Sequence, residues 1–117
     1  MNVVMVGAGY VGLVSGACFA EFGASVVCVD KDEGRIQRLH SGEMPIYEPG
    51  LEQLVDKNVE AGRLRFTSTL AEVVPSADLV FIAVGTPTRR GDCHADLKYV
   101  YAAAEEVAGY LSGYTVI

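Results

Sequence analysis

The sequence predicts an α/β fold, a doubly wound parallel sheet with helices on both of its faces. Two observations lead to this prediction. Short apolar segments rich in valine alternate with longer segments of helical periodicity, as they do in β-α-β units. The first of these units also contains a glycine-rich turn, Gly7-Ala8-Gly9-Tyr10-Val11-Gly12, between a strand and a helix. That combination is typical of a Rossmann-like domain.

The first part of the chain alternates strand and helix. Asn2–Val6 is a short apolar strand, and the segment Tyr10–Phe22 reads as a helix that is followed directly by a glycine. Ser25–Val29 is a second, valine-rich strand. Asp32 has the side chain to cap the next helix, which we expect to run to about Ser41 before another glycine.

A loop with two prolines, Glu43–Pro49, separates this part from a third predicted helix over Leu51–Ala61. The third strand is Leu64–Thr67, and Thr69 with Glu72 fits a capping box at the start of a short helix. The expected apolar side of the third helix consists of Leu51, Leu54, Val55 and Val59.

The last part contains the most apolar strand and the clearest amphipathic helix. Asp78–Val84 is apolar enough to be central in a sheet. Asp96–Leu111 repeats apolar residues at intervals of three and four. These residues are Leu97, Val100, Tyr101, Ala104, Val107, Ala108 and Leu111. Tyr114–Ile117 starts a fifth strand, so we expect residues 1–117 to form a dinucleotide-binding domain truncated at that strand, with central and C-terminal substrate domains beyond it.

Composition excludes several classes of function. The net charge of −6 argues against binding the phosphate backbone of nucleic acid, and no apolar run reaches the length of a membrane span. Cys18, Cys28 and Cys93 form no CxxC pair, which favours reduced thiols in a cytoplasmic protein. His40 and His94 stand apart without companion ligands, so no metal site is predicted.

The glycine turn is the strongest local indication of a ligand. Gly7 permits a tight turn out of the strand, Gly9 has no Cβ to block a pyrophosphate, and Gly12 allows close packing of the helix. The helix N-terminus adds free N–H groups and the positive end of the helix dipole.

Asp30 follows 23 residues after Gly7, at the end of the second strand, where a carboxylate accepts hydrogen bonds from the adenosine ribose. It would repel the 2′-phosphate of NADP, so NAD is the predicted cofactor. Arg35 complicates this prediction, because an arginine there can hold a 2′-phosphate. A protein that binds FAD or S-adenosylmethionine on the same fold is a rival interpretation.

Three further segments are more specific: PIYEPGLEQL at Pro45–Leu54, FIAVGTPT at Phe81–Thr88, and Gly91 with Asp96-Leu97 before the last helix. Together with the opening MNVVMVGAGYVGLVSGACFAEFGASVVCVDKD, they resemble the nucleotide-sugar 6-dehydrogenases over essentially the whole chain. The segment PIYEPGL favours the UDP-glucose branch of that family. The GDP-mannose and UDP-N-acetylmannosamine branches are the alternatives, and a stand-alone nucleotide-binding module is a further one.

The resemblance implies a two-step oxidation of a sugar C6 alcohol to a carboxylate with two NAD per turnover, and a homo-oligomeric full-length protein. It implies that Val11, Asp30, Arg35 and Thr86 contact NAD. With the glycine turn, the predicted cofactor-binding residues are Gly7, Gly9, Tyr10, Val11, Gly12, Asp30, Arg35 and Thr86.

The family's catalytic cysteine lies in a GGSC-like segment that does not occur here, so no catalytic residue is predicted in this chain. Cys18 and Cys28 fall in apolar runs and are read as reduced core thiols, whereas the loop residue Cys93 is read as an incidental thiol. Glu48 is read as a loop carboxylate with a structural role, and Tyr47 as a packing residue.

Overall fold

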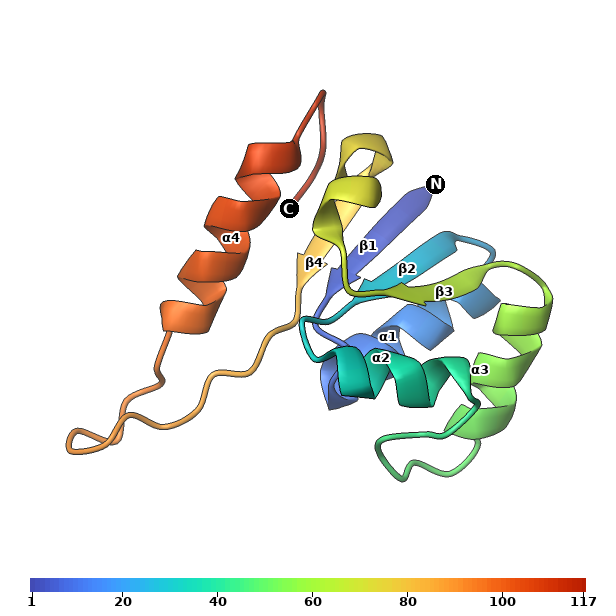
Figure 1. Ribbon diagram of the computed structural model, residues 1–117, viewed down its shortest axis with the longest axis horizontal. Helices are drawn as coiled ribbons and strands as arrows, with labels where there is room; N and C mark the ends of the chain where they lie inside the picture. Colours follow the sequence, from blue (N-terminus) through green and yellow to red (C-terminus); the bar gives the residue numbers. More distant parts are fainter.

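A fully parallel, four-stranded sheet organises the computed structural model, which describes residues 1–117 (Figure 1). The strand order is β3-β2-β1-β4, so β1 lies inside the sheet and β3 at one edge. In chain order the elements are β1 (Asn2–Val6), α1 (Tyr10–Glu21), β2 (Ser25–Val29), α2 (Glu33–His40), α3 (Leu51–Glu60), β3 (Leu64–Thr67), the 3₁₀ turns η1 (Leu70–Glu72) and η2 (Val74–Ser76), β4 (Leu79–Ile82) and α4 (Lys98–Tyr110).

The order of the strands reverses once, next to β1. From β1 the chain moves outward through β2 to β3, and it then returns to place β4 on the opposite side of β1. Val3 accordingly pairs with Val26 of β2 and with Leu79 of β4. In open parallel sheets, the carboxyl ends of the strands at such a reversal form a crevice in which ligands bind.

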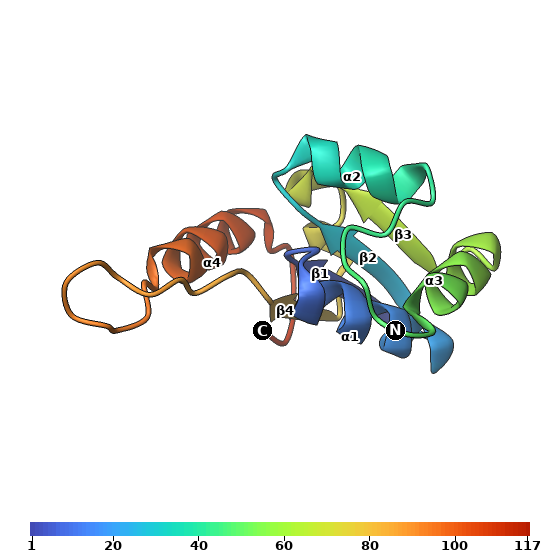
Figure 2. The same cartoon turned by 90° about the horizontal axis from the view of Figure 1, so that it is seen from below.

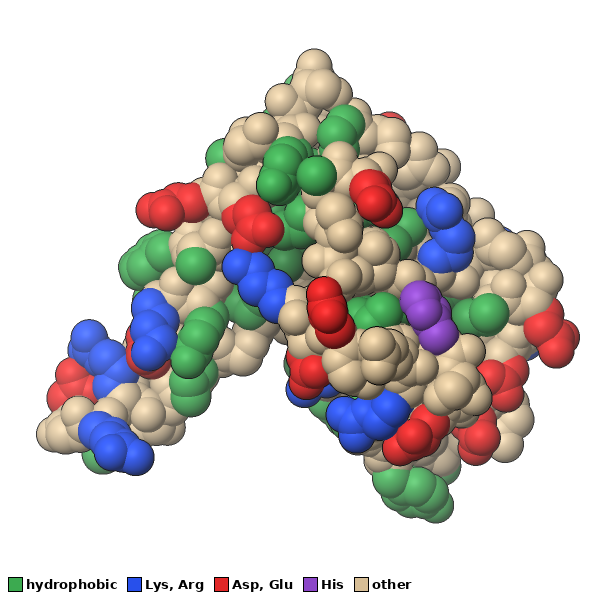
Figure 3. All heavy atoms as spheres, viewed as in Figure 1, with side chains coloured by type: hydrophobic (Ala, Val, Ile, Leu, Met, Phe, Trp, Pro, Cys, Tyr) green, Lys and Arg blue, Asp and Glu red, His purple; other side chains and the backbone are tan.

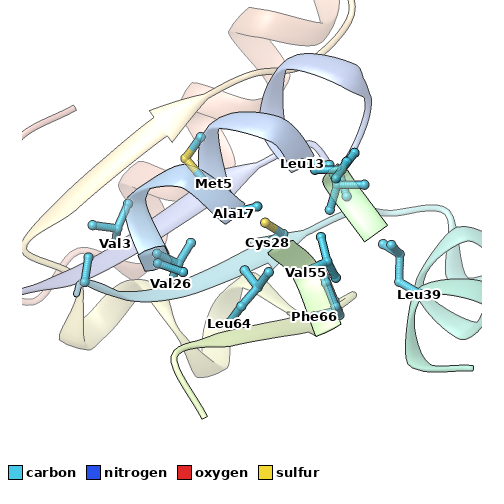
Figure 4. Close-up of a cluster of buried hydrophobic side chains, with 14 of the residues drawn as sticks. Val3, Met5, Leu13, Ala17, Val26, Cys28, Leu39, Val55, Leu64 and Phe66 are labelled. Atoms are coloured by element: carbon cyan, nitrogen blue, oxygen red, sulfur yellow. The ribbon is translucent and has the colours of Figure 1, made fainter. Parts of the chain in front are cut away.

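Helices cover both faces of the sheet, as the sequence predicted (Figure 2). Alternate residues of each strand point to opposite faces, so Val3 and Met5 pack under α1, α2 and α3, whereas Val4 and Val6 pack against η1, η2 and α4. The larger cluster is drawn in Figure 4, where strand residues such as Val26, Cys28 and Leu64 lie together with Ala17 of α1. The doubly wound arrangement is therefore confirmed.

Close contact between α1 and the sheet depends on Gly16, which the sequence did not single out. A Cβ at this position would lie 2.7 Å from Sγ of Cys28 and 3.4 Å from Cγ of Met5. Both side chains are buried strand residues of the core. A hydrogen atom in place of a side chain therefore lets the middle of α1 rest on β1 and β2.

The side that α3 buries is the predicted one except at Val59, and Leu54 packs partly buried against the core. Leu51 and Val55 are buried, but Val59 is 43% exposed and the polar Asn58 is fully buried instead. The Asn58 side chain donates to Glu21 Oε2 and to the Leu54 carbonyl, both at 2.9 Å. A hydrogen-bonded amide can be buried at this position because every polar atom it carries has a partner, since its oxygen accepts from Arg63 Nε at 3.0 Å.

The structure differs from the prediction in three elements: the short helix after Thr69, the fourth strand and the fifth strand. The capping box is wrong, because Thr69 caps no helix and the segment forms the 3₁₀ turns η1 and η2. The fourth strand stops at Ile82, and the predicted fifth strand is reduced to one parallel bridge between Leu79 and Val116. The outer side of β4 is thus paired at a single point, and its predicted central place in the sheet is not reached in this chain.

The face of α4 that packs on the sheet also differs from the predicted apolar face. Of the predicted apolar positions only Val107 is buried, and Ala103 joins it, whereas Leu97 and Tyr101 are exposed. The helix contacts the sheet through this narrow strip and through η1 and η2. A long loop, residues 83–97, extends away from the body before the chain returns as α4 (Figure 1). No helix has both the length and the hydropathy needed to cross a membrane.

We expect Gly16→Ala to lower the free energy of unfolding by about 1–3 kcal/mol, the usual cost of forcing extra volume into a packed core. Gly109→Ala is the matched control, because Gly109 is also helical and a Cβ there meets nothing within 4 Å. The control should gain about 0.5–1 kcal/mol from helix propensity. Urea unfolding of both variants measures this difference, and equal effects would contradict the packing role of Gly16.

Candidate dinucleotide-binding site

A cleft of about 590 Å³ opens at the carboxyl ends of β1 and β4, where the strand order reverses. Its walls come from the glycine turn, the β2–α2 turn, the first residues after β4 and one side of α4. The space-filling view shows a deep notch between the body and the arm formed by α4 and its preceding loop (Figure 3). Residues lining the cleft include Gly7, Gly9, Asp30, Lys31, Arg35, Ala83, Gly85, Pro87, Tyr99 and Glu106.

Two glycines of the turn are required by close packing. Gly7 has a φ of +109°, and a Cβ there would lie 2.6 Å from the carbonyl oxygen of Ala83. A Cβ on Gly12 would lie 1.8 Å from the carbonyl oxygen of Gly7. The turn, the first coil of α1 and the end of β4 are therefore locked together, and no residue with a side chain fits at either position.

Gly9 has a different role, because a Cβ there would meet no protein atom within 4 Å. The space over Gly9 is open and belongs to the cleft. Gly9 is also the N-cap residue of α1 and provides no side-chain cap, and the first turn of the helix contains no acidic residue. The first N–H groups of α1 thus have no side-chain partner, which is the arrangement that binds phosphate at a helix N-terminus.

Asp30 connects the turn to the second β-α unit. Its Oδ2 accepts from the buried N–H of Ala8 at 2.9 Å and from Nη1 of Arg35 at 2.8 Å, and its Oδ1 accepts from the N–H of Asp32 at 2.9 Å. A carboxylate has about four acceptor positions. One position on Oδ1 therefore remains for a hydroxyl donor in the cleft.

Burial on its own would raise the pKa of the Asp30 carboxyl. The two backbone N–H groups and the Arg35 guanidinium stabilise the charged form more strongly, so the pKa lies below its ordinary value of 3.8. Asp30 is ionised at neutral pH. It can accept a hydrogen bond from a ribose hydroxyl and repels a phosphate on that ribose.

Arg35 lies on the wall of the cleft and is engaged by Asp30. The conflict seen in the sequence, between an acid that rejects a 2′-phosphate and an arginine that attracts one, is resolved in the structure by their ion pair. Asp32 caps α2 as predicted, accepting from the Arg35 N–H at 3.0 Å, and this cap orients the turn of helix that carries the guanidinium.

Tyr10, Val11 and Thr86 do not line the cleft, although each is next to a residue that does or to the turn itself. Tyr10 and Val11 are exposed on the first turn of α1. The Tyr10 hydroxyl donates to Oε2 of Glu48 at 2.8 Å, and this carboxylate raises the pKa of the phenol. Thr86 is exposed between Gly85 and Pro87.

The structure agrees with one of the two predictions made for the segment PIYEPGL, that for Glu48, and contradicts the one for Tyr47. Glu48 holds its loop against α1 through Tyr10, which agrees with a structural role. Tyr47 is 91% exposed, so its predicted packing role is wrong.

The sequence did not reveal that α4 forms a wall of the cleft. Tyr99, Ala102, Ala103 and Glu106 line it, and they follow the three-four spacing of one helix face. This spacing is present in the sequence, but the apolar repeat of the same helix predicts burial of a neighbouring face. Lys31, which also lines the cleft, gave no signal because a lone lysine at the start of a helix is ordinary.

The cysteines have no catalytic surroundings in this structure. Burial raises the pKa of the Cys28 thiol to about 12, which keeps it neutral and inert. Cys93 is exposed in the long loop, and all three cysteines are free. No group of three or more side chains is placed to hold a metal ion.

The residues in the cleft fit a dinucleotide. They supply an open backbone over Gly9, uncapped N–H groups for the pyrophosphate, and one free acceptor position on an ionised carboxylate for the ribose. The cleft is also within the 300–1,000 Å³ range typical of small-molecule sites.

Comparison with known proteins agrees with this geometry. Residues 1–117 match the NAD binding domain of the UDP-glucose/GDP-mannose dehydrogenase family. A UDP-glucose 6-dehydrogenase of Rhizobium meliloti is 64% identical over 117 residues, which are the whole of this chain and 27% of that protein.

Two solved structures superpose closely. GDP-mannose dehydrogenase from Pseudomonas aeruginosa, solved as a ternary complex, gives a TM-score of 0.89 at 34% identity, with 94% of this chain and 25% of that chain covered. UDP-glucose dehydrogenase from Pyrobaculum islandicum gives 0.85 at 43% identity, with 91% and 24% covered. The chain therefore spans about a quarter of the proteins it matches. It belongs to the UDP-glucose/GDP-mannose dehydrogenase family and corresponds to the NAD-binding domain of that family.

Proposed function

We propose that the predicted residues bind NAD in the cleft, and that the protein to which this domain belongs oxidises UDP-glucose to UDP-glucuronate in two NAD-dependent steps. The observation that carries the proposal is the ionised Asp30 carboxylate beside the glycine turn, with one acceptor position left on Oδ1. The 64% identity to a UDP-glucose 6-dehydrogenase supports the substrate.

Each residue has a defined part in holding the cofactor. The open backbone at Gly9 and the N–H groups of Tyr10, Val11 and Gly12 bind the pyrophosphate, and Gly7 and Gly12 keep the turn in shape. Asp30 accepts from the adenosine ribose and Arg35 keeps its carboxylate charged and oriented. Thr86 joins the site through its position after β4, between two residues of the cleft wall. When bound, NAD supplies the hydride acceptor for the oxidation of the sugar.

This domain binds and orients the cofactor, and we place no catalytic residue in it. The nucleophile and the proton-transferring groups belong to the central and C-terminal parts of the proposed full-length protein. We also propose that this protein is a homo-oligomer, that its small-molecule partners are a nucleotide sugar and NAD, and that it binds neither nucleic acid nor membrane. Three free cysteines support a cytoplasmic location.

Two other nucleotide sugars are alternatives to UDP-glucose as the substrate. A GDP-mannose dehydrogenase is also a close structural neighbour, and so is a UDP-N-acetylmannosamine dehydrogenase from Staphylococcus aureus, with a TM-score of 0.85. A stand-alone nucleotide-binding module remains the alternative from outside the enzymes. It predicts NAD binding with no partner domain and no oxidation of any sugar.

Asp30→Asn should weaken NAD binding by about tenfold or more, because a hydrogen bond to a charged group contributes about 1.5–3 kcal/mol. Asp32→Asn is the matched control. It removes the same charge two residues away, Asn caps a helix as well as Asp does, and Asp32 does not line the cleft. Calorimetric titration of the 117-residue chain measures both variants, with circular dichroism to confirm that they are folded. Equal affinities in Asp30→Asn and the unmodified chain would refute the assignment of Asp30.

The same carboxylate predicts a dependence of stability on pH. The pKa of Asp30 is lower in the folded than in the unfolded chain, so its ionisation stabilises the fold above the ordinary value of 3.8. This contribution is lost as the pH falls below that value, through the folded pKa. We expect the free energy of unfolding to fall more steeply below pH 3.8 in the unmodified chain than in Asp30→Asn. Parallel pH profiles would contradict the charge network at Asp30.

The proposed full-length protein should produce two NADH for each UDP-glucose, since an alcohol that becomes a carboxylate loses four electrons. Absorbance at a limiting amount of sugar measures this ratio, and GDP-mannose and UDP-N-acetylmannosamine are the comparison substrates. A ratio of two with one of those sugars and no turnover of UDP-glucose would overturn the assignment of the sugar. One NADH per sugar would overturn the two-step reaction.

A further inference from the structure

A second ion pair, besides that of Arg35 with Asp30, lies on the wall of the cleft. Nζ of Lys31 is 2.7 Å from Oε2 of Glu106. The two residues come from opposite walls, since Lys31 follows β2 and Glu106 lies on α4, and both line the cleft. The lysine side chain is 74% exposed and that of Glu106 is 34% exposed, so the pair lies at the rim.

Each of the two ion pairs consists of one cation and one carboxylate, and both pairs lie in the wall of the cleft. Two cations follow Asp30 in the chain: Lys31 is the next residue, and Arg35 lies in the first turn of α2. Each cation is matched by a carboxylate, Arg35 by Asp30 and Lys31 by Glu106. The net charge of these four side chains is zero. Without the two carboxylates, a lysine and an arginine would face the same part of the cleft, a combination that typically binds phosphate.

We propose that Glu106 is a second determinant of the choice between NAD and NADP, acting by neutralising Lys31. The inference rests on the proposed role of Asp30 at the adenosine ribose. Asp30 repels a 2′-phosphate directly. Glu106 removes the cation that would otherwise attract it, from a helix more than 70 residues away in the sequence.

The chemistry of the two cofactors makes the proposal specific. NADP differs from NAD by one phosphate at the 2′ position of the adenosine ribose, and such a phosphate carries about −1.5 to −2 charges at pH 7. Replacing Glu106 by glutamine leaves the charge of Lys31 without its carboxylate partner and changes the size of the side chain little. Binding of NADP should therefore improve relative to binding of NAD, which has no phosphate at the 2′ position.

The test is a titration of the 117-residue chain with NAD and NADP in the variants Glu106→Gln and Glu105→Gln. Glu105 is the matched control, because it is the preceding residue of α4, carries the same charge, is exposed and makes no ion pair. We expect Glu106→Gln to raise the ratio of NADP to NAD affinity by about fivefold. This is the fold-change that corresponds to an exposed ion pair of about 1 kcal/mol.

Two further measurements separate the proposed mechanism from a general change in charge. Adding Lys31→Met to Glu106→Gln should abolish the gain in NADP affinity, because the attracting cation is then absent. Raising the salt concentration from about 0.05 M to 0.5 M should reduce the gain, because rim charges are screened. The control Glu105→Gln should leave the ratio unchanged.

Several outcomes would overturn the inference. A gain of the same size in Glu105→Gln would show that only the overall charge matters. An equal loss of affinity for NAD and NADP in Glu106→Gln would show that the pair merely holds α4 in place. An unchanged ratio, with NAD bound normally, would refute the role of Glu106 and leave the proposed function intact. Failure of the folded, unmodified chain to bind NAD would instead overturn the proposed function, and this inference with it.

Discussion

The carboxylate of Asp30 is the interaction on which the cleft depends. It accepts from the N–H of Ala8 in the glycine turn, from the N–H of Asp32 at the start of α2 and from the side chain of Arg35. These groups belong to two successive β-α connections, so one residue fixes the position of each relative to the other. The side chain is 11% exposed, and in that surrounding an unpaired charge would be costly. Its three donors offset this cost and leave one acceptor position free on Oδ1.

The strand order explains why Asp30 lies in the wall of a cleft. β1, β2 and β4 end side by side, and the reversal at β1 sends the following segments away in opposite directions. The turn after β1 is then pressed against the end of β4, where Gly7 and Ala83 are in contact. α4 adds a further wall, formed by Tyr99, two alanines and Glu106. Residues far apart in the sequence thus form one crevice.

Much of this arrangement could be predicted from the sequence. The glycine spacing, the valine-rich strands and the acid after the second strand are local patterns with a local physical meaning. They led to the correct fold, and the structure places the glycine turn and the acid at one cleft. Long-range contacts could not be predicted in the same way. Gly16 matters because Cys28 lies opposite it, and Asn58 is buried because Glu21 and Arg63 satisfy its amide. The inward face of α4 was misjudged for the same reason, since periodicity shows that a helix has faces and leaves open which one a neighbour covers.

The packing of the glycine turn has a consequence for how a ligand is received. Gly7, Gly12 and Ala83 lie so close together that the backbone of the turn has a single conformation consistent with the fold. The site is therefore preorganised, and the loss of conformational entropy that accompanies ordering of a loop occurs during folding and not during association. A rigid cradle of this kind favours rigid-body docking over induced fit in the phosphate region. Any adjustment on binding is left to the other wall, where α4 meets the sheet along a narrow strip.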